Sequence, residues 1–337
     1  MLVHDRRGLR RLGRTGHLLK PPTDLPGTAE PVLAGRPAGP AADIEARRAQ
    51  LARLKGIGLM CLALACFSVL DGAAKWLVRD MPALQVAFVR YTVALALIAA
   101  FLNPWTQADA WTTRRPFLQF VRGLLLFGST IFNFIAVRTL QLADTMAIAF
   151  ATPFLIALLS GPLLGERIGW KNWVAILIGF AGVLVITRPG TGGFQTAMLW
   201  SFGSVACYAA YGIATRTLSG IDSTASMLVI SAAIPVGMLA PVMPAVWVWP
   251  PTTLDWALML LLGLAGAVGH FFLIRAYTHA PAPVVAPFIY TQIVWAVLIG
   301  YLVFGDLPGL NTIVGASIVI GSGLYLIWRE TGPSAGR

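Results

Sequence analysis

Long apolar runs, separated by short connections, make up the chain from residue 56 onward. A helix needs about 20 mostly apolar residues to cross the hydrocarbon core of a bilayer. The connections hold helix-breaking pairs such as Met81-Pro82 and Asn103-Pro104. This pattern predicts an all-helical (all-α) membrane protein with ten transmembrane helices. The ten runs are Gly56–Val78, Ala83–Leu102, Phe117–Val137, Thr145–Leu164, Trp170–Thr187, Ala197–Thr217, Ala225–Trp247, Trp256–Tyr277, Val284–Phe304 and Leu310–Trp328.

The second five runs repeat the outline of the first five at a constant offset. Sliding the sequence by 140 residues places Gly72 on Gly212, and the Gly165-Glu166 turn on Gly305-Asp306. Because five is an odd number, the second copy enters the membrane from the opposite side. Such inverted-topology repeats are typical of secondary transporters. We expect one five-helix repeat over residues 56–188 and a second over residues 196–329.

Composition agrees with a protein dissolved in lipid. Of the 337 residues, 57% are hydrophobic and 12% are charged, whereas soluble domains carry about 25% charged residues. The net charge of +11 does not indicate nucleic acid, because 11 of the 25 Lys and Arg lie within residues 1–55 and no basic stripe follows. That segment lacks the continuous apolar core of a signal peptide. It is expected to form a disordered basic tail.

Basic residues also predict the orientation of the chain. With the N-terminus inside, the connections at 247–255 and 305–309 fall outside and hold no Lys or Arg. Cytoplasmic segments of membrane proteins are enriched in these residues, so both termini are expected in the cytoplasm. The inner side then holds the basic tail, Arg114-Arg115, Arg167 with Lys171, Arg216, Arg275 and Arg329.

The first run carries two charged residues on one helical face. Asp71 and Lys75 are spaced i, i+4 and can pair directly. One interpretation is a self-neutralised pair that lets the helix insert. The other is a wall of the substrate cavity, because ionisable groups inside a membrane usually face a partner or a watery cavity. The repeat favours the second interpretation, since it places Ser68 and Asp71 on Tyr208 and Tyr211, which also form a polar and aromatic face.

Other polar residues lie within the runs. Arg122 lies near a membrane boundary and is expected to snorkel, whereas Arg90 lies deeper and either pairs with Asp71 or binds an anion. For each of the mid-span residues Asn133, Tyr290 and Gln292, and for Trp295, helix–helix hydrogen bonding or packing is preferred to ligand contact. As a set they are expected to converge on one cavity. For His270, packing is preferred to a role as a proton carrier. The candidate substrate-binding residues are Asp71, Lys75, Arg90, Asn133, Tyr208, Tyr211, Tyr290, Gln292 and Trp295.

Prolines and acidic residues mark the fourth and ninth runs. Pro153, Pro283 and Pro287 each remove a helix hydrogen bond and predict bends, which are either static kinks or hinges. Glu166 and Asp306 stand at helix ends and are interpreted as structural.

The three cysteines lie inside apolar runs without ligand spacing, so neither a metal nor a cofactor is expected.

These features resemble a known family. The pattern Pro153…Gly165-Glu166-Arg167…Trp173…Gly179…Gly182, with its echo at Gly305-Asp306…Gly315…Gly321, is similar to that of EamA-type ten-helix carriers of the drug/metabolite transporter superfamily. The resemblance covers residues 56–330. The second copy departs from it with Asp306-Leu307-Pro308 where the first has Glu166-Arg167-Ile168. The resemblance implies alternating access without ATP.

The sequence therefore predicts a secondary carrier, in the cytoplasmic membrane, for a small organic metabolite that is amphipathic, partly charged or aromatic. The Asp-x-x-x-Lys motif in the first helix resembles that of relatives assigned to riboflavin or S-adenosylmethionine uptake. A specific importer of riboflavin or of S-adenosylmethionine is therefore one alternative. An intramembrane enzyme using Asp71 and His270 is an alternative of another class, although no catalytic motif supports it. The expected partners are the metabolite and the bilayer, without nucleic acid, and a homodimer stays open.

Overall fold

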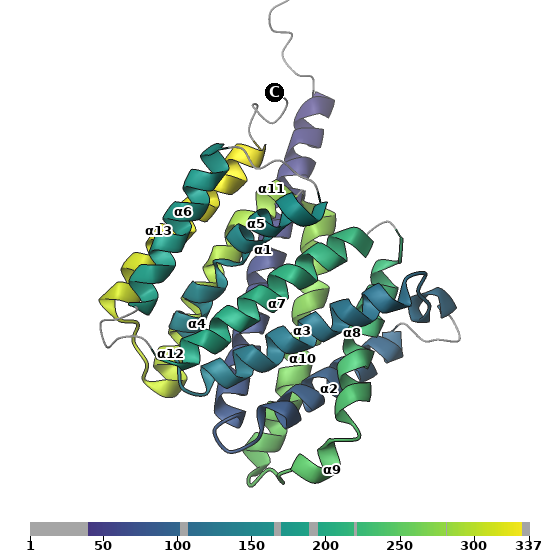
Figure 1. Ribbon diagram of the computed structural model, residues 1–337. Coiled ribbons are helices and arrows are strands. Elements are labelled where there is room, and N and C mark those ends of the chain that lie inside the picture. The colour runs from purple at the N-terminus through teal and green to yellow at the C-terminus, as the bar shows by residue number, and fades with distance from the viewer. Residues whose placement is uncertain are drawn as a thin grey trace, which may run out of the picture. The chain divides into compact units, whose positions relative to one another are not determined.

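Helices make up all the regular elements of the computed structural model in the residues that it describes, 40–101, 107–164, 170–188, 195–218, 221–280 and 282–331 (Figure 1). By its internal contacts the chain divides into Met1–Glu45 and Ala46–Arg337. All packing and polar contacts discussed below belong to the second unit. The predicted turn at Gly165-Glu166-Arg167 and residues 1–39 of the predicted tail lie outside the described residues.

The elements fall into two sets in chain order. The first set is α1 (Pro40–Leu77), α2 (Ala83–Phe101), η1 (Ala108–Trp111), α3 (Pro116–Val137), α4 (Leu142–Ala149), α5 (Thr152–Leu164) and α6 (Trp170–Thr187). The second set is α7 (Ala197–Leu218), α8 (Thr224–Leu239), α9 (Met243–Val246), α10 (Thr253–His279), α11 (Ala282–Val285), η2 (Ala286–Thr291), α12 (Gln292–Phe304) and α13 (Leu310–Thr331).

Ten apolar helical segments of the described residues correspond in order to the ten predicted runs. Five are long and apolar enough to cross a membrane, and the other five are shorter. The long segments are Gln50–Leu77, Ala83–Phe101, Pro116–Val137, Ala197–Leu218 and Thr253–Ala276. The shorter ones are Leu142–Ile156, Trp173–Thr187, Thr224–Leu239, Phe288–Phe304 and Leu310–Tyr325. The sequence-based prediction of an all-helical membrane protein is therefore confirmed.

The first helix begins earlier than the sequence pattern predicts. The structure starts α1 at Pro40, whereas the apolar run begins only at Gly56. The prediction that residues 40–55 belong to a disordered tail is therefore wrong. These residues include Ala, Glu, Arg, Gln and Leu, which are good helix formers even where no apolar run marks them.

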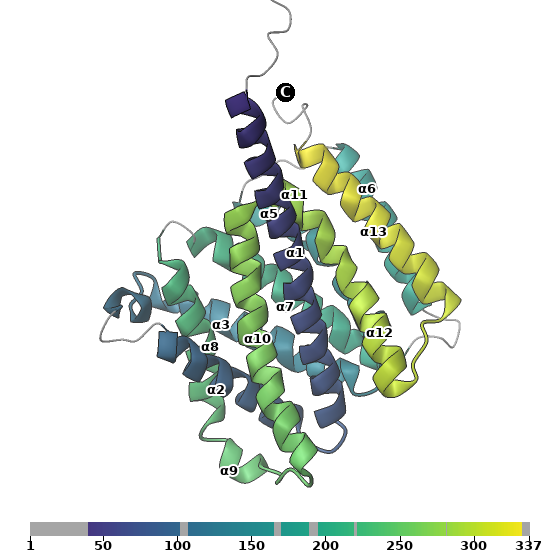
Figure 2. The same ribbon diagram turned by 180° about the vertical axis from the view of Figure 1, so that it is seen from behind.

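Two pairs of antiparallel helices show the twofold relation between the repeats. Along α1 and α10, Leu70 approaches Gly266 and Trp76 donates a hydrogen bond to Asp255, so the two helices run in opposite directions (Figure 2). Along α3 and α7, Arg122 contacts Thr215 and Ser129 contacts Ser204, again in opposite directions. The offset of 140 residues turns α1 into α7 and α3 into α10, so the two pairs are counterparts.

Glycine at one recurring position allows close approach of the helices. A Cβ atom at Gly72 in α1 would lie 2.8 Å from a methyl carbon of Ile299 in α12. A Cβ at the counterpart, Gly212 in α7, would lie 3.3 Å from a methyl carbon of Ile156 in α5. The Gly72–Gly212 coincidence in the sequence therefore has a physical cause, because a larger residue at Gly72 would force α1 and α12 apart.

The fourth and ninth spans are both interrupted. The fourth ends as α4 at Ala149 and resumes as α5 at Thr152, with Pro153 in the first turn of the new helix, where its missing N–H costs little. The ninth passes through α11 and η2 before α12 begins. Phe150 and its counterpart Tyr290 pack edge to face at these interruptions, with ring centroids 5.0 Å apart. The bends predicted from the prolines are therefore helix breaks.

Candidate functional site

Asp71 is a buried carboxylate in the span of α1. Its side chain is 9% exposed and accepts a hydrogen bond from Nδ2 of Asn133 in α3, at 3.0 Å. Within the described residues, no cation lies in ion-pair contact with Asp71, since the ion pair found there joins Lys75 and Asp306. A buried carboxylate with only a neutral donor is costly in a membrane. Asp71 and Asn133, both predicted site residues, therefore lie together.

Arg90 in α2 supplies a cation to the same region. Its Nη1 donates to Oγ1 of Thr130 at 2.7 Å, and its guanidinium lies over the rings of Tyr91 and Phe134, at 5.0 and 5.9 Å from their centroids. The charge of Arg90 is close enough to interact electrostatically with Asp71, although the two groups form no ion pair. The direct Arg90–Asp71 pairing offered as one alternative is therefore absent from this arrangement.

His270 borders this group from α10. Its ring packs edge to face against Phe67, with centroids 5.0 Å apart, and it also lies within electrostatic reach of Arg90. The preferred prediction of a packed histidine agrees with this aromatic contact. Four helices, α1, α2, α3 and α10, thus surround two opposite charges that each use neutral hydrogen-bond partners. We call Asp71, Arg90, Asn133 and His270 the charged centre.

Lys75 does not pair with Asp71, contrary to the prediction from their spacing. Its Nζ lies 2.5 Å from Oδ2 of Asp306 and 3.0 Å from the carbonyl oxygen of Leu140. The ammonium also lies 4.9 Å from the centroid of the Phe304 ring. The i, i+4 spacing permits contact, but a carboxylate at the end of α12 competes for the same long side chain. Lys75 therefore connects the two repeats.

A second contact joins the repeats at the same end of the unit. Oγ1 of Thr312 in α13 donates to Asp144 in α4 at 2.6 Å. We call this contact and the Lys75–Asp306 pair the Asp306 end. Asp144 and the partner role of Asp306 were both missed, although each is an acidic residue beside a helix terminus in a chain poor in acids. The interpretation of Asp306 as only a helix-end residue was too narrow.

The opposite end is held together by Asp222, in the connection between α7 and α8. Its carboxylate accepts hydrogen bonds from Thr113 Oγ1 at 2.5 Å, from the Arg114 backbone N–H at 2.9 Å and from Gln119 Nε2 at 2.8 Å. Burial opposes the charged form, but these hydrogen bonds outweigh it and hold the pKa of Asp222 below its usual value. We call this network the Asp222 end.

Arg122 does not snorkel, so that prediction is wrong. Its side chain is 2% exposed, and its guanidinium donates to Thr215, Gln119, the Met227 carbonyl and the hydroxyl of Tyr211. Oxygen atoms on α3, α7 and α8 accept hydrogen bonds from the guanidinium and replace its water of hydration. The charge of Arg122 can therefore stay buried between these helices. The structure therefore joins Arg122 to the Asp222 end through Gln119.

The aromatic candidates and Gln292 have contacts of their own. The rings of Tyr208 and Tyr211 on α7 have centroids 5.7 Å apart and are tilted by 31°, and Arg122 lies over the Tyr211 ring. Tyr290 is buried, and within the described residues its hydroxyl faces the backbone at Gly323 without a hydrogen-bond partner. Trp295 packs partly buried against a cluster that includes Met60 in α1. The backbone carbonyl of Gln292 accepts a 3.5 Å hydrogen bond from Ser68. Of the nine predicted residues, the structure thus brings Asp71, Arg90 and Asn133 together.

Two helical repeats, ten apolar segments and two opposite charges within the spans are together typical of a membrane carrier. Comparison with known sequences agrees, because residues 54–188 and 195–329 each match the EamA-like transporter family. The chain belongs to this family, within the drug/metabolite transporter superfamily, and is a multi-pass membrane transporter of small metabolites.

The alignments with curated relatives cover most of the length of each relative. An S-adenosylmethionine uptake transporter of Rickettsia prowazekii is 30% identical, over 82% of this chain and 94% of that protein. A riboflavin transporter of Rhizobium johnstonii is 30% identical, over 80% and 90%. A pseudopaline exporter of Pseudomonas aeruginosa is 29% identical, over 79% and 93%. These relatives are transporters, which confirms that the chain is not an enzyme.

A solved crystal structure has the same fold. It aligns with a TM-score of 0.54 at 18% identity, over 84% of this chain and 99% of the other. At this identity the likeness concerns the fold alone.

Proposed function

We propose that the chain carries a zwitterionic metabolite across the cytoplasmic membrane, with S-adenosylmethionine as the first candidate. The observation behind this proposal is the pair of opposite charges in the charged centre. Asp71 and Arg90 are each hydrogen-bonded to a neutral group and are not paired with each other. A solute with an ammonium or sulfonium and a carboxylate supplies the missing partner to each, which offsets the cost of holding both charges inside the membrane.

Two features support a mechanism of alternating access. The interrupted fourth and ninth spans lie at counterpart positions, and such broken helices are common at transporter sites. Polar contacts join the repeats at both the Asp306 end and the Asp222 end. In the proposed cycle, one repeat rocks against the other, so that the contacts of one end open while those of the other end hold.

Riboflavin is the second candidate, favoured by the neighbouring rings of Tyr208 and Tyr211. A flat isoalloxazine ring suits an aromatic surface, and relatives named riboflavin transporters match a similar share of the chain. Riboflavin has no carboxylate or ammonium, however, and so leaves Asp71 and Arg90 without partners. The two candidates therefore differ in their dependence on Arg90.

Cells that express the chain are expected to accumulate radiolabelled S-adenosylmethionine. Unlabelled S-adenosylmethionine should compete, whereas riboflavin should not. Because Arg90 would bind the carboxylate, Arg90→Gln should lower uptake at least roughly 30-fold, as expected when one partner of a buried charge pair is lost. Arg115→Gln, an exposed change in the connection before α3, is the matched control and should leave uptake unchanged.

Uptake of riboflavin that is insensitive to Arg90→Gln would replace the first candidate by the second. Undiminished uptake of S-adenosylmethionine by well-expressed Arg90→Gln would remove Arg90 from the proposed site.

The proposed orientation places both termini in the cytoplasm. Reporter fusions at Gly192 and Trp249 should report the outer compartment, and fusions at Arg114 and Arg337 the inner one. The physical reason is the enrichment of Lys and Arg on the inner side. An external reporter at Arg337 would contradict the orientation or the even number of spans.

A further inference from the structure

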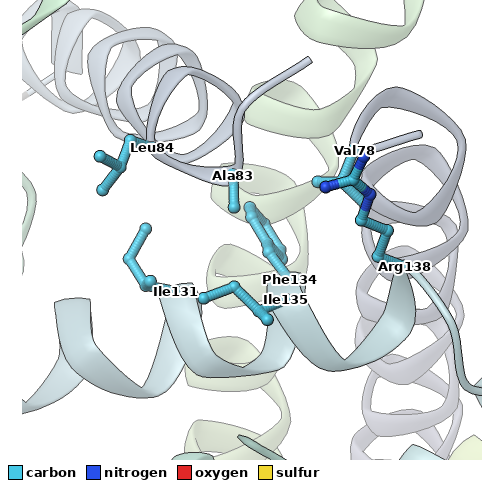
Figure 3. A pocket seen from close by; sticks show the side chains of 7 residues that line it. All are labelled: Val78, Ala83, Leu84, Ile131, Phe134, Ile135 and Arg138. Carbon is cyan, nitrogen blue, oxygen red and sulfur yellow. The ribbon is translucent and has the colours of Figure 1, made fainter. Parts of the chain in front are cut away.

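A pocket of about 360 Å³ opens between α2 and α3 (Figure 3), and no residue of the charged centre lines it. Six of its lining side chains are apolar, and one is a cation. They are Val78, Ala83, Leu84, Ile131, Phe134, Ile135 and Arg138. The lining offers no hydrogen-bonding side chain other than Arg138, so a polar solute would lose its water here without compensation.

The cation and the apolar lining lie at different depths along α3. Arg138 is the residue at which this membrane-spanning helix ends, whereas Ile135, Phe134 and Ile131 lie one to two turns further into the span. At a rise of about 1.5 Å per residue, Ile131 lies roughly 10 Å from Arg138 along the helix axis. A charged group at the membrane boundary above an apolar slot matches the division of a phospholipid into headgroup and acyl chain.

Arg138 is available to such a headgroup. It is exposed, and within the described part of the chain one of its N–H groups is hydrogen-bonded, from Nη2 to the carbonyl oxygen of Arg79 at 3.4 Å. The guanidinium of Arg79 lies instead over the rings of Trp76 and Phe304. Arg138 is therefore the cation that faces this pocket, with donors left for phosphate oxygens.

Phe134 separates the pocket from the charged centre. Its ring is a wall of the pocket, and the guanidinium of Arg90 lies 5.9 Å from the ring centroid. The aromatic ring thus stands between the guanidinium of Arg90 and the pocket. An acyl chain in the pocket would contact the ring without meeting a charge.

We propose that this pocket binds an anionic phospholipid, with one acyl chain between α2 and α3 and the phosphate at Arg138. An anionic lipid fits better than a zwitterionic one, because the amine of the latter places a second positive charge near Arg138. The apolar lining distinguishes a lipid from free phosphate, which has nothing to place in the slot.

Native mass spectrometry of the purified full chain, titrated with phosphatidylglycerol, phosphatidylcholine or glycerol phosphate, tests this site. Phosphatidylglycerol should bind to the wild type, phosphatidylcholine more weakly, and glycerol phosphate not at all. Arg138→Gln should weaken phosphatidylglycerol roughly fivefold, the effect of one basic residue at a membrane surface. Arg79→Gln removes the same charge next to the pocket and should change the affinity little.

Ile131→Phe and Leu84→Phe fill the pocket from opposite helices and should each reduce bound lipid, with size-exclusion profiles confirming that the variants are folded. Equal affinity of wild type, Arg138→Gln and both filling variants for phosphatidylglycerol would overturn the proposal. So would glycerol phosphate binding as tightly as the lipid. The experiment measures lipid binding to the purified protein, so its result does not depend on which solute the protein transports.

Discussion

Replacing Asp71 by asparagine is expected to abolish most transport while the protein remains folded. The change removes the charge but keeps a carbonyl oxygen that can accept the hydrogen bond from Asn133. If Asp71 binds a cationic group of the solute, its loss should cost at least about 2 kcal/mol of binding, or roughly 30-fold in uptake. Initial rates of uptake, normalised to the amount of protein in the membrane, measure this effect.

Asp80→Asn is the matched control for this experiment. Asp80 is an exposed carboxylate in the connection that follows α1, close in sequence to Asp71 but outside the charged centre. Its replacement should leave uptake unchanged. Wild-type rates for Asp71→Asn would show that Asp71 serves insertion or packing alone. Asp71 would then not bind the cationic group of the proposed zwitterionic solute.

The Lys75–Asp306 pair is expected to stabilise the fold strongly, and its two residues unequally. The side chain of Lys75 is 7% exposed and that of Asp306 is 27% exposed. Asp306→Asn leaves a buried ammonium without its carboxylate and should lower the free energy of unfolding by about 3–5 kcal/mol. Lys75→Met should cost less, about 2 kcal/mol, because water reaches the remaining carboxylate.

The double variant Lys75→Met/Asp306→Asn should recover most of this loss, since no unpaired charge remains inside. Unfolding of the purified proteins in one detergent completes the double-mutant cycle, with Asp109→Asn, an exposed carboxylate, as control. Additive effects of the two single changes would show that the pair contributes no coupling. A larger loss for Lys75→Met than for Asp306→Asn would contradict the burial argument.

The two predictions separate residues that the sequence treated as a unit. Asp71 and Lys75 are one turn apart, yet the first faces Asn133 of its own repeat and the second faces Asp306 of the other repeat. We therefore expect Asp71 to affect transport with little effect on folding. We expect Lys75 to affect stability first.

Apolar run length and spacing by themselves determined the class of this protein. Whether a segment can cross a bilayer depends on its own composition, so the ten spans and the duplication could be predicted without tertiary contacts. The Gly72–Gly212 recurrence was also visible, because close helix approach requires a small residue at the same place in each copy. The prolines likewise marked both interrupted spans, since a proline is tolerated in the first turn of a helix but not in its interior.

Only the tertiary structure decided which polar groups meet. Lys75 reaches an acceptor 231 residues away in the chain, and Arg122 reaches Thr215, Tyr211 and Met227 instead of the membrane surface. A long side chain has several partners within its radius, and the rotation and tilt of neighbouring helices select among them. Those rotations follow from the packing of whole helices, which no local spacing records.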